Sequence, residues 1–200
     1  MNMAPITLDN TAVRLDTGSR RASLQAATQH QHRDLDELVA DLDLSTLTHY
    51  RQFLRASAAA LIGIEALLER AGIEQLLPDW SERTRTAAIL ADLRQLKATA
   101  TPFDLRRAAP SAAEMFGMAY VLEGSRLGSK VLLARVRNAP DIAVRTATSY
   151  LGANDAHWWR SFLQALENAP EADDGSATTA GAIYAFALFQ RAFATLGDGL

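Results

Sequence analysis

Apolar residues recur at helical spacing along most of the chain, beginning directly after Ser19. At 100° per residue, the first such stretch gathers its apolar side chains on one face, with Arg and Asp opposite. That face holds Leu24, Thr28, Leu35, Leu38, Val39 and Leu42. Residues 1–18 show no such period and end in Thr-Gly-Ser, so we predict a flexible N-terminal leader followed by one helical domain over residues 19–200.

The same spacing predicts six more helices, separated by proline, glycine and capping residues. Ser45 is placed to cap the next helix, and Ser111 with Glu114 forms a predicted capping pair further on. The approximate helix ranges are 45–71, 80–98, 111–137, 141–152, 155–169 and 178–196. No segment is typical of a β-strand, and neither a linker nor a repeat divides the chain. The predicted fold is a single compact multi-helix, all-α domain.

The composition supports this helical interpretation. Of 200 residues, 38 are Ala and 28 are Leu, against 13 Val and Ile together. Ala and Leu lose little conformational freedom in a helix, whereas β-branched residues favour strands. Hydrophobic residues make up 48% of the chain and charged residues 22%, which provides enough apolar material for a sizeable core.

Charge and cysteine content exclude several classes of protein. The absence of cysteine excludes disulfide scaffolds, thiol catalysis, zinc fingers and iron–sulfur clusters. A net charge of −3 argues against a generic nucleic-acid binder and against a polybasic membrane-surface protein. The longest apolar runs are about ten residues, roughly half of a membrane span, and the N-terminus lacks the apolar core of a secretory signal. The sequence therefore predicts a soluble, cytoplasmic protein without membrane or nucleic-acid partners.

Several familiar catalytic motifs are missing. The chain has no Gly-x-Ser-x-Gly turn for a nucleophilic serine, no glycine-rich loop after a strand, and no Glu-x-x-His pair for a di-iron centre. Four histidines remain as candidates for chemistry: His30, His32, His49 and His157. The three tryptophans, Trp80, Trp158 and Trp159, are interpreted as packing residues.

His32 is the histidine that borders the apolar face of the first helix, whereas His30 falls on the polar, solvated side. Asp36 lies one turn after His32. Its carboxylate can accept the N–H of one ring nitrogen and leave the other nitrogen free as a metal ligand. The same spacing also suits a surface His–Asp pair without a role, and spacing alone favours that simpler interpretation.

Gly124 and Gly128 are the second unusual feature, in the segment Tyr120-Val-Leu-Glu-Gly-Ser-Arg-Leu-Gly128. They lie four residues apart on one stripe of a predicted helix, where each glycine costs about 1 kcal/mol relative to alanine. Such a pair indicates that something approaches the backbone closely. From the residues alone, a neighbouring helix is the favoured partner and a flat ligand is the alternative.

Two segments together resemble the haem oxygenase family: Leu24-Gln-Ala-Ala-Thr28 followed by His32, and Tyr120 to Gly128. The resemblance runs from about residue 20 to residue 195 and is greatest to the bacterial, biliverdin-producing branch, whose members often accompany bacteriophytochromes. It favours the ligand interpretation of both His32 and the glycine pair. It implies a helical fold that holds haem between its first helix and a kinked distal helix.

The resemblance also implies roles for residues on the two faces of the haem. His32 would be the axial ligand of the haem iron, and Asp36 would hold that histidine. Gly124 and Gly128 would carry the distal helix across the other haem face, where Ser125 would help to hold water.

Further residues are implied as partners of the haem propionates. Tyr120 and Arg160 match family residues that bind a propionate. Many relatives have a lysine where this chain has Gln25, which puts the cleavage position in doubt. Arg21, one turn earlier, is the nearest compensating charge, and Arg20 is another candidate.

The implied activity is the oxidative opening of haem at a meso carbon to biliverdin, carbon monoxide and iron, with haem as both substrate and prosthetic group. No flavin or nicotinamide motif is visible, so a ferredoxin or flavoprotein reductase would supply electrons, and a bacteriophytochrome is a candidate acceptor of biliverdin. One alternative is a protein on the same scaffold that binds haem or another tetrapyrrole without turning it over. Another is an interaction bundle in which the glycines only seat a helix.

Overall fold

Within residues 19–169 and 175–195, which the computed structural model describes, the chain forms helices and no β-strand. In chain order these are α1 (Arg20–Ala27), α2 (Gln29–Ala40), α3 (Leu47–Arg70), the 3₁₀ turn η1 (Ile73–Gln75), α4 (Trp80–Arg83), α5 (Thr86–Gln95), α6 (Ala112–Arg137), α7 (Ile142–Thr146), α8 (Ser149–Gly152), α9 (Ala156–Glu167) and α10 (Ser176–Ala194). None of them is long and apolar enough to cross a membrane. The all-α prediction is confirmed, and the leader predicted over residues 1–18 lies outside the described residues.

Three of the predicted helices are each divided in two. The first breaks at Thr28, where the backbone leaves the helical region (φ −109°, ψ 5°), so that α1 ends and α2 begins. Thr28 is buried, and its hydroxyl donates to the carbonyl of Leu24 at 2.8 Å. The predicted helices 80–98 and 141–152 are divided into α4 and α5 and into α7 and α8. Apolar spacing continues across the break at Thr28, so the sequence pattern does not reveal that break.

The helix ends show which capping predictions are correct. At the start of α6, Ser111 accepts from the backbone N–H of Glu114, and the Glu114 carboxylate accepts from the Ser111 N–H at 2.8 Å, which completes a capping box. The N-cap of α3 is Thr46 rather than the predicted Ser45. Ser45 instead donates its hydroxyl to the carboxylate of Asp43 at 2.7 Å.

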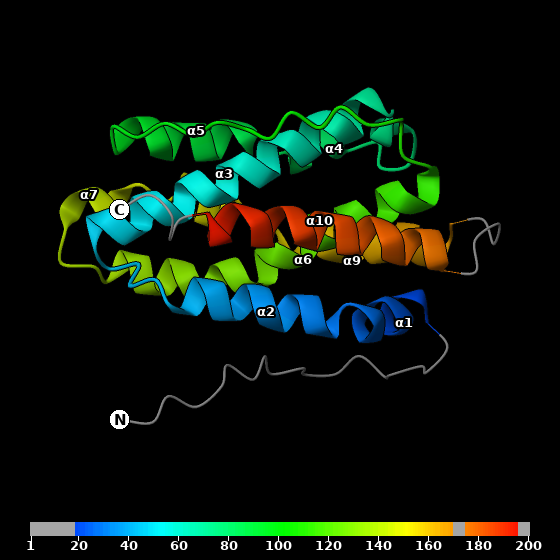
Figure 1. Ribbon diagram of the computed structural model, residues 1–200, viewed down its shortest axis with the longest axis horizontal. Coiled ribbons are helices and arrows are strands. Elements are labelled where there is room, and N and C mark those ends of the chain that lie inside the picture. Colours follow the sequence, from blue (N-terminus) through cyan, green and yellow to red (C-terminus); the bar gives the residue numbers. More distant parts are fainter. Residues whose placement is uncertain (1–18, 170–174, 196–200) are drawn as a thin grey trace.

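The central helix of the fold is α10. It packs against α6, α3 and α2, and in Figure 1 it lies between α3 above and α2 below. It meets α6 backbone to backbone. A Cβ on Gly117 would lie 2.7 Å from the backbone nitrogen of Ala182, and a Cβ on Gly181 would lie 2.8 Å from the backbone of Glu114. Neither distance leaves room for a methyl group, so this α6–α10 crossing requires glycine on both helices.

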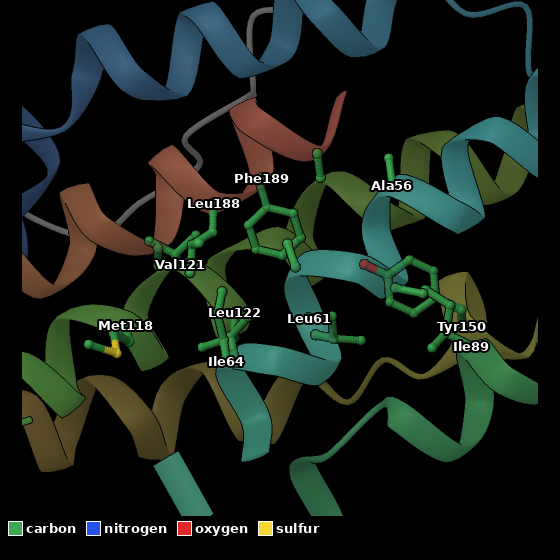
Figure 2. Packing of buried hydrophobic residues seen from close by; sticks show 14 of the residues in the cluster. Ala56, Leu61, Ile64, Ile89, Met118, Val121, Leu122, Tyr150, Leu188 and Phe189 are labelled. Carbon is green, nitrogen blue, oxygen red and sulfur yellow. The ribbon is translucent and has the colours of Figure 1, made fainter. Parts of the chain in front are cut away.

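The hydrophobic core lies where α3, α6 and α10 meet. Figure 2 shows side chains from all three helices gathered there: Leu61 and Ile64 from α3, Met118, Val121 and Leu122 from α6, and Leu188 and Phe189 from α10. Ile89 of α5 and Tyr150 of α8 extend the core at one end. Each such aliphatic or aromatic side chain stabilises the fold by about 1.5–3 kcal/mol when it is fully buried. The core therefore holds α6 in place against α3 and α10.

Three helix N-termini are capped by carboxylates that belong to other helices. Glu167 of α9 accepts the first two backbone N–H groups of α1 at 3.1 and 3.0 Å. Glu65 of α3 accepts two at the start of α5 at 2.8 and 3.0 Å, and Asp92 of α5 accepts two at the start of α8 at 2.9 and 2.8 Å. These bonds satisfy backbone donors that have no partner inside their own helix. Burial raises the pKa of both Glu65 and Asp92.

Candidate functional site

His32 lies on α2 against α10. Its ring centre is 6.0 Å from that of Phe186, edge-on at 65°, and its side chain is about half exposed, at 54%. The Nδ1 atom is 2.9 Å from the carboxylate of Asp36, so an N–H there donates to Asp36 and leaves Nε2 free as a ligand. The hydrogen bond to Asp36 raises the pKa of His32 above 6.5, and partial burial opposes this shift more weakly.

His30 shows that the His–Asp spacing alone does not mark a site. Its Nδ1 lies 2.7 Å from Asp34, so it forms the same one-turn pair, but its side chain is 71% exposed. The prediction that His30 is solvated is confirmed. What distinguishes His32 is its contact with Phe186 and a side chain that is less exposed than that of His30, at 54% against 71%.

Gly124 and Gly128 lie on a stripe of α6 that no backbone of the described residues approaches closely. A Cβ on Gly128 would meet no atom of the described residues within 4 Å, and one on Gly124 would meet only the ring of Trp159, at 3.8 Å. Leu127 and Val131, in the same stripe, are 38% and 37% exposed. We call these four positions of α6 the open stripe. Close helix seating, backbone to backbone, is found at the α6–α10 crossing and not at this glycine pair, where, among the described residues, only the Trp159 ring of α9 touches the place of a Cβ on Gly124.

The start of the open stripe is tied to the start of α2 through Tyr120 and Thr28. The side chain of Tyr120 on α6 lies close to Thr28, directly before α2, and from this point both helices run in the same direction (Figure 1). His32 follows Thr28 by one turn, while Gly124 and Gly128 follow Tyr120 by one and two turns. The two sequence motifs are therefore brought to the same side of the fold, with the contact between Tyr120 and Thr28 closing one end.

One arginine of α1 reaches this closed end. The guanidinium of Arg21 lies 6.0 Å from the centre of the Trp159 ring. Burial raises the pKa of Tyr120, and the nearby charge of Arg21 opposes that shift. Arg20 is engaged elsewhere, because its Nη1 donates to the carbonyl of Leu166 at 3.1 Å. Of the two arginines considered in place of the missing lysine, Arg21 is thus the one that faces the site.

Arg160 is exposed on α9, directly after Trp159. It lines a cavity of about 240 Å³ together with Trp159 and with Lys130 and Leu127 of α6. Neither Arg160 nor Lys130 forms an ion pair with another residue of the described ranges. Their charges are therefore available to an anionic ligand that extends beyond the open stripe.

Ser125 faces the interior rather than the open stripe. Its hydroxyl donates to the carbonyl of Leu122 at 2.7 Å and accepts from Nη2 of Arg85 at 2.8 Å. Arg85 is buried, with its guanidinium 5.1 Å from the centre of the Tyr150 ring. Its Nε and Nη1 have no hydrogen-bond partner in the described part of the chain. The role of Ser125 in holding distal water stays a prediction.

Trp159 packs against the core, as the sequence predicts, with its ring stacked on that of Phe162. The sequence does not indicate that this ring also stands beside Gly124 and lies 5.8 Å from the ring of Tyr120. The only sequence signal was its position directly before Arg160, which the family resemblance had marked. Spacing within a helix does not show which neighbouring helix a tryptophan reaches.

Known proteins resemble this chain over most of its length. The family model described as "Heme oxygenase" matches residues 20–195. The chain belongs to the haem oxygenase family. Among this haem oxygenase's relatives, "Heme oxygenase" of Xanthomonas campestris pv. campestris is 33% identical over 121 residues, which cover 59% of this chain and 72% of the relative. "Heme oxygenase PigA" of Pseudomonas aeruginosa is 27% identical over 167 residues, 80% of this chain and 83% of the relative.

Solved structures of haem oxygenases share the fold. The NO- and CO-bound enzyme from Neisseria meningitidis matches with a TM-score of 0.69 at 20% identity, covering 92% of this chain and 94% of that one. The enzyme from Leptospira interrogans gives 0.68 at 19% identity, covering 88% and 98%. The family prediction from two motifs is confirmed, and with it the prediction that this haem oxygenase is an oxidoreductase. The bacteriophytochrome-associated branch stays a prediction.

Proposed function

We propose that this haem oxygenase binds haem between α2 and the open stripe of α6, with Nε2 of His32 as the axial ligand of the iron. One observation carries the proposal. A histidine held at Nδ1 by Asp36 follows Thr28 by one turn, and the glycines of the open stripe follow Tyr120, which lies close to Thr28, by one and two turns. The residues present suit a flat apolar ring with two carboxylates. The stripe and Phe186 are apolar, and arginines stand at both margins.

Haem, when bound, supplies the redox chemistry that opens its ring at a meso carbon to biliverdin, carbon monoxide and iron. The protein binds and orients it. Asp36 holds a proton at Nδ1 of His32 and so keeps Nε2 as the coordinating atom. A neutral imidazole, unlike a thiolate, does not push strongly toward cleavage of the O–O bond. Gly128, with no atom within 4 Å of the place of a Cβ, leaves room for dioxygen beside the backbone.

The propionates would be met by cations at the two margins of the slot. Arg21 stands with Tyr120 at the closed end, and Arg160 stands with Lys130 beside the cavity at the other margin. Gln25 is exposed on α1 and offers no charge. A partly buried arginine–carboxylate pair with two parallel hydrogen bonds is stronger than an exposed one. Arg21, which is partly buried, would therefore contribute more to haem affinity than the exposed Arg160, and both would favour one orientation of the ring.

We also propose an external electron donor, either a ferredoxin or a flavoprotein reductase. The family match over residues 20–195 accounts for nearly the whole chain with a single haem-binding fold, which leaves no room for a second cofactor domain in that range. Delivery of biliverdin to a bacteriophytochrome and a cytoplasmic location stay predictions from the sequence. Transfer of biliverdin to an added apo-phytochrome and cell fractionation test these two statements.

The proposal is tested by adding haemin to the purified apoprotein and recording the Soret band for the parent, His32→Ala and His30→Ala. His30 is the matched control because it carries the same one-turn carboxylate pair two residues away. We expect His32→Ala to lose the imidazole-ligated spectrum and His30→Ala to keep it. The reverse result would show that the ligand assignment is wrong.

Adding a reductant in air separates the remaining alternatives. Loss of the Soret band with the appearance of biliverdin identifies a catalyst. A Soret band that persists identifies a protein that binds haem without turnover. No Soret band at all identifies an interaction bundle.

A further inference from the structure

We infer that Trp159 is a specificity-determining wall of the haem slot, positioned by the buried Glu123 and its two arginines, and that it selects which meso carbon faces the open end of the stripe. This inference rests on the proposed function. It concerns the in-plane rotation of the haem and not whether haem is bound.

Trp159 stands at one end of the open stripe. Its ring would lie 3.8 Å from a Cβ on Gly124, which is ordinary van der Waals contact. It is stacked on Phe162 with ring centres 5.8 Å apart at 22°, and Tyr120 lies at the same distance on another side. Phe162 is fully buried, so the indole is fixed from behind by the core. An aromatic wall therefore meets the stripe at Gly124.

The other glycine of the stripe has no such neighbour. A Cβ on Gly128, one turn further along α6, would meet nothing within 4 Å among the described residues. The slot is therefore unequal along its length, filled beside Gly124 and open beside Gly128. If one edge of the haem contacts the indole of Trp159, only the opposite edge lies in the open space beside Gly128. The meso carbon in that part is the one accessible to dioxygen.

A buried ionic cluster holds this wall in place. Glu123, the residue before Gly124, has a side chain that is 1% exposed. Its carboxylate accepts from Nη1 of Arg83 at 3.2 Å and from Nε of Arg126 at 3.2 Å. We call these three residues the Glu123 clasp.

The clasp joins the distal helix directly to the segment that carries the tryptophan. The same Nη1 of Arg83 that binds Glu123 also donates to the carbonyl of Trp158 at 2.9 Å. The guanidinium of Arg126 lies 4.7 Å from the centre of the Trp158 ring, and its Nη1 donates to the carbonyl of Ala153. One guanidinium thus links the residue before Gly124 to the residue before Trp159.

The charged residues of the clasp indicate that it positions α9 relative to α6 rather than adding to the stability of the fold. Two arginines and one glutamate lose most of their hydration here, and burial lowers the pKa of Arg126. Replacing a buried ion pair by apolar side chains of similar volume is often neutral or stabilising. Charged groups do, however, impose directional bonds that apolar side chains cannot. Those bonds set the distance between α6 and α9.

The test compares Trp159→Ala, Trp159→Phe and Glu123→Gln with the parent. Two readouts are recorded: the ratio of biliverdin isomers after turnover, and the proton NMR pattern of the haem methyl groups in the ferric complex, which reports in-plane rotation without turnover. Asp92→Asn is the control, because Asp92 on α5 is also a buried carboxylate, but it binds the N-terminus of α8 and takes no part in the clasp.

We expect Trp159→Ala to shift both readouts toward a mixture of orientations and Trp159→Phe to restore much of the parent pattern. Glu123→Gln should shift them in the same direction, and Asp92→Asn should lower stability without shifting either. An unchanged isomer ratio and an unchanged NMR pattern in Trp159→Ala would show that Trp159 does not orient the haem. A folded Glu123→Gln variant with the same isomer ratio and NMR pattern as Asp92→Asn would show that the clasp does not position Trp159. If the proposed function itself is wrong, the parent protein will show no Soret band when haemin is added, before any variant is compared.

Discussion

At the α6–α10 crossing, backbone atoms of the partner helix lie within 3 Å of the place where a Cβ on Gly117 or Gly181 would stand. At the open stripe, eleven residues further along the same helix, a Cβ on Gly128 would meet nothing within 4 Å. In sequence these glycines look alike, since each lies in a helix interior where alanine is more stable. The comparison teaches that a glycine inside a helix does not by itself show what packs against it. At Gly117 and Gly181 the backbone of the partner helix does so, whereas at Gly128 the space is open to the haem proposed above.

The largest expected effect is at the crossing. Gly117→Ala places a methyl group against the backbone of α10, which cannot move aside as a side chain could. Overpacking typically costs about 1–3 kcal/mol, and we expect the free energy of unfolding to fall by about the upper value. Urea denaturation of the apoprotein measures it. Gly128→Ala is the matched control and should gain up to about 1 kcal/mol from helix propensity. Equal losses in both variants would contradict the comparison.

Gly128→Leu tests the second half of the comparison, the open space at the open stripe. The larger side chain enters open space, so the melting temperature should stay near that of the parent or rise. Haem should still bind through His32, but the space proposed for dioxygen is filled, so biliverdin formation should fall by about tenfold or more, equivalent to about 1.4 kcal/mol in the barrier. Melting temperature and product yield are measured on the same sample. A Gly128→Leu variant that is destabilised but fully active would show that α6 does not lie on the distal face of the haem.

A smaller effect is expected at the margin of the open stripe. Arg160→Ala removes a charge proposed for a propionate. Because this side chain is exposed, the loss in haem affinity should be under about 1 kcal/mol, together with a changed isomer ratio. Titration with haemin and separation of the isomers measure both. Arg20→Ala is the control on the α1 side, since Arg20 is bound to the carbonyl of Leu166. Identical behaviour of the two variants would exclude Arg160 from the site.

The smallest effect concerns pH on the α2 side of the slot. The pKa of His32 is raised above its unfolded value of 6.5, chiefly by the hydrogen bond to Asp36. The stability that this pair contributes to the apoprotein is therefore fully present below pH 6.5 and is lost as pH rises through the folded-state pKa. Haem affinity changes in the opposite sense, because a proton on Nε2 competes with iron. Affinity should rise with pH over that window.

Asp36→Asn tests the origin of this pH dependence. Without the carboxylate, the pKa of His32 should fall and the window in which affinity rises should move to lower pH. NMR titration of the His32 ring in the apoprotein, together with haemin titrations across the same pH range, measures the shift. The two curves should move together. A pH profile unaffected by the substitution would show that another group controls binding.

The fold and both motifs were predictable because they depend on local pattern. The capping box of Ser111 and Glu114 depends on two residues three apart, and the structure contains it as predicted. The first helix was predicted as continuous because its apolar face continues through Thr28. The break there accompanies a buried contact with Tyr120, which lies far along the chain.

The burial of three arginines could not be predicted from the sequence, because it too depends on residues far along the chain. Arg83, Arg85 and Arg126 would each be assigned to the surface from their chemistry alone, yet all three are buried. Their burial depends on Glu123 and on backbone carbonyls supplied by other segments. Likewise, no local signal separates Gly117 from Gly124. In each case the deciding partner is set by tertiary packing.

The carboxylates that cap helices from elsewhere in the chain impose an order on assembly. Helices as short as α8, with four residues, are unstable in isolation because nucleation is unfavourable. The first turn of α8 depends on Asp92 of α5, and α5 in turn begins against Glu65 of α3. We therefore expect α3, α5 and α8 to become structured in that sequence. Amide hydrogen exchange should show protection retreating in reverse order, from α8 through α5 to α3, as denaturant is added.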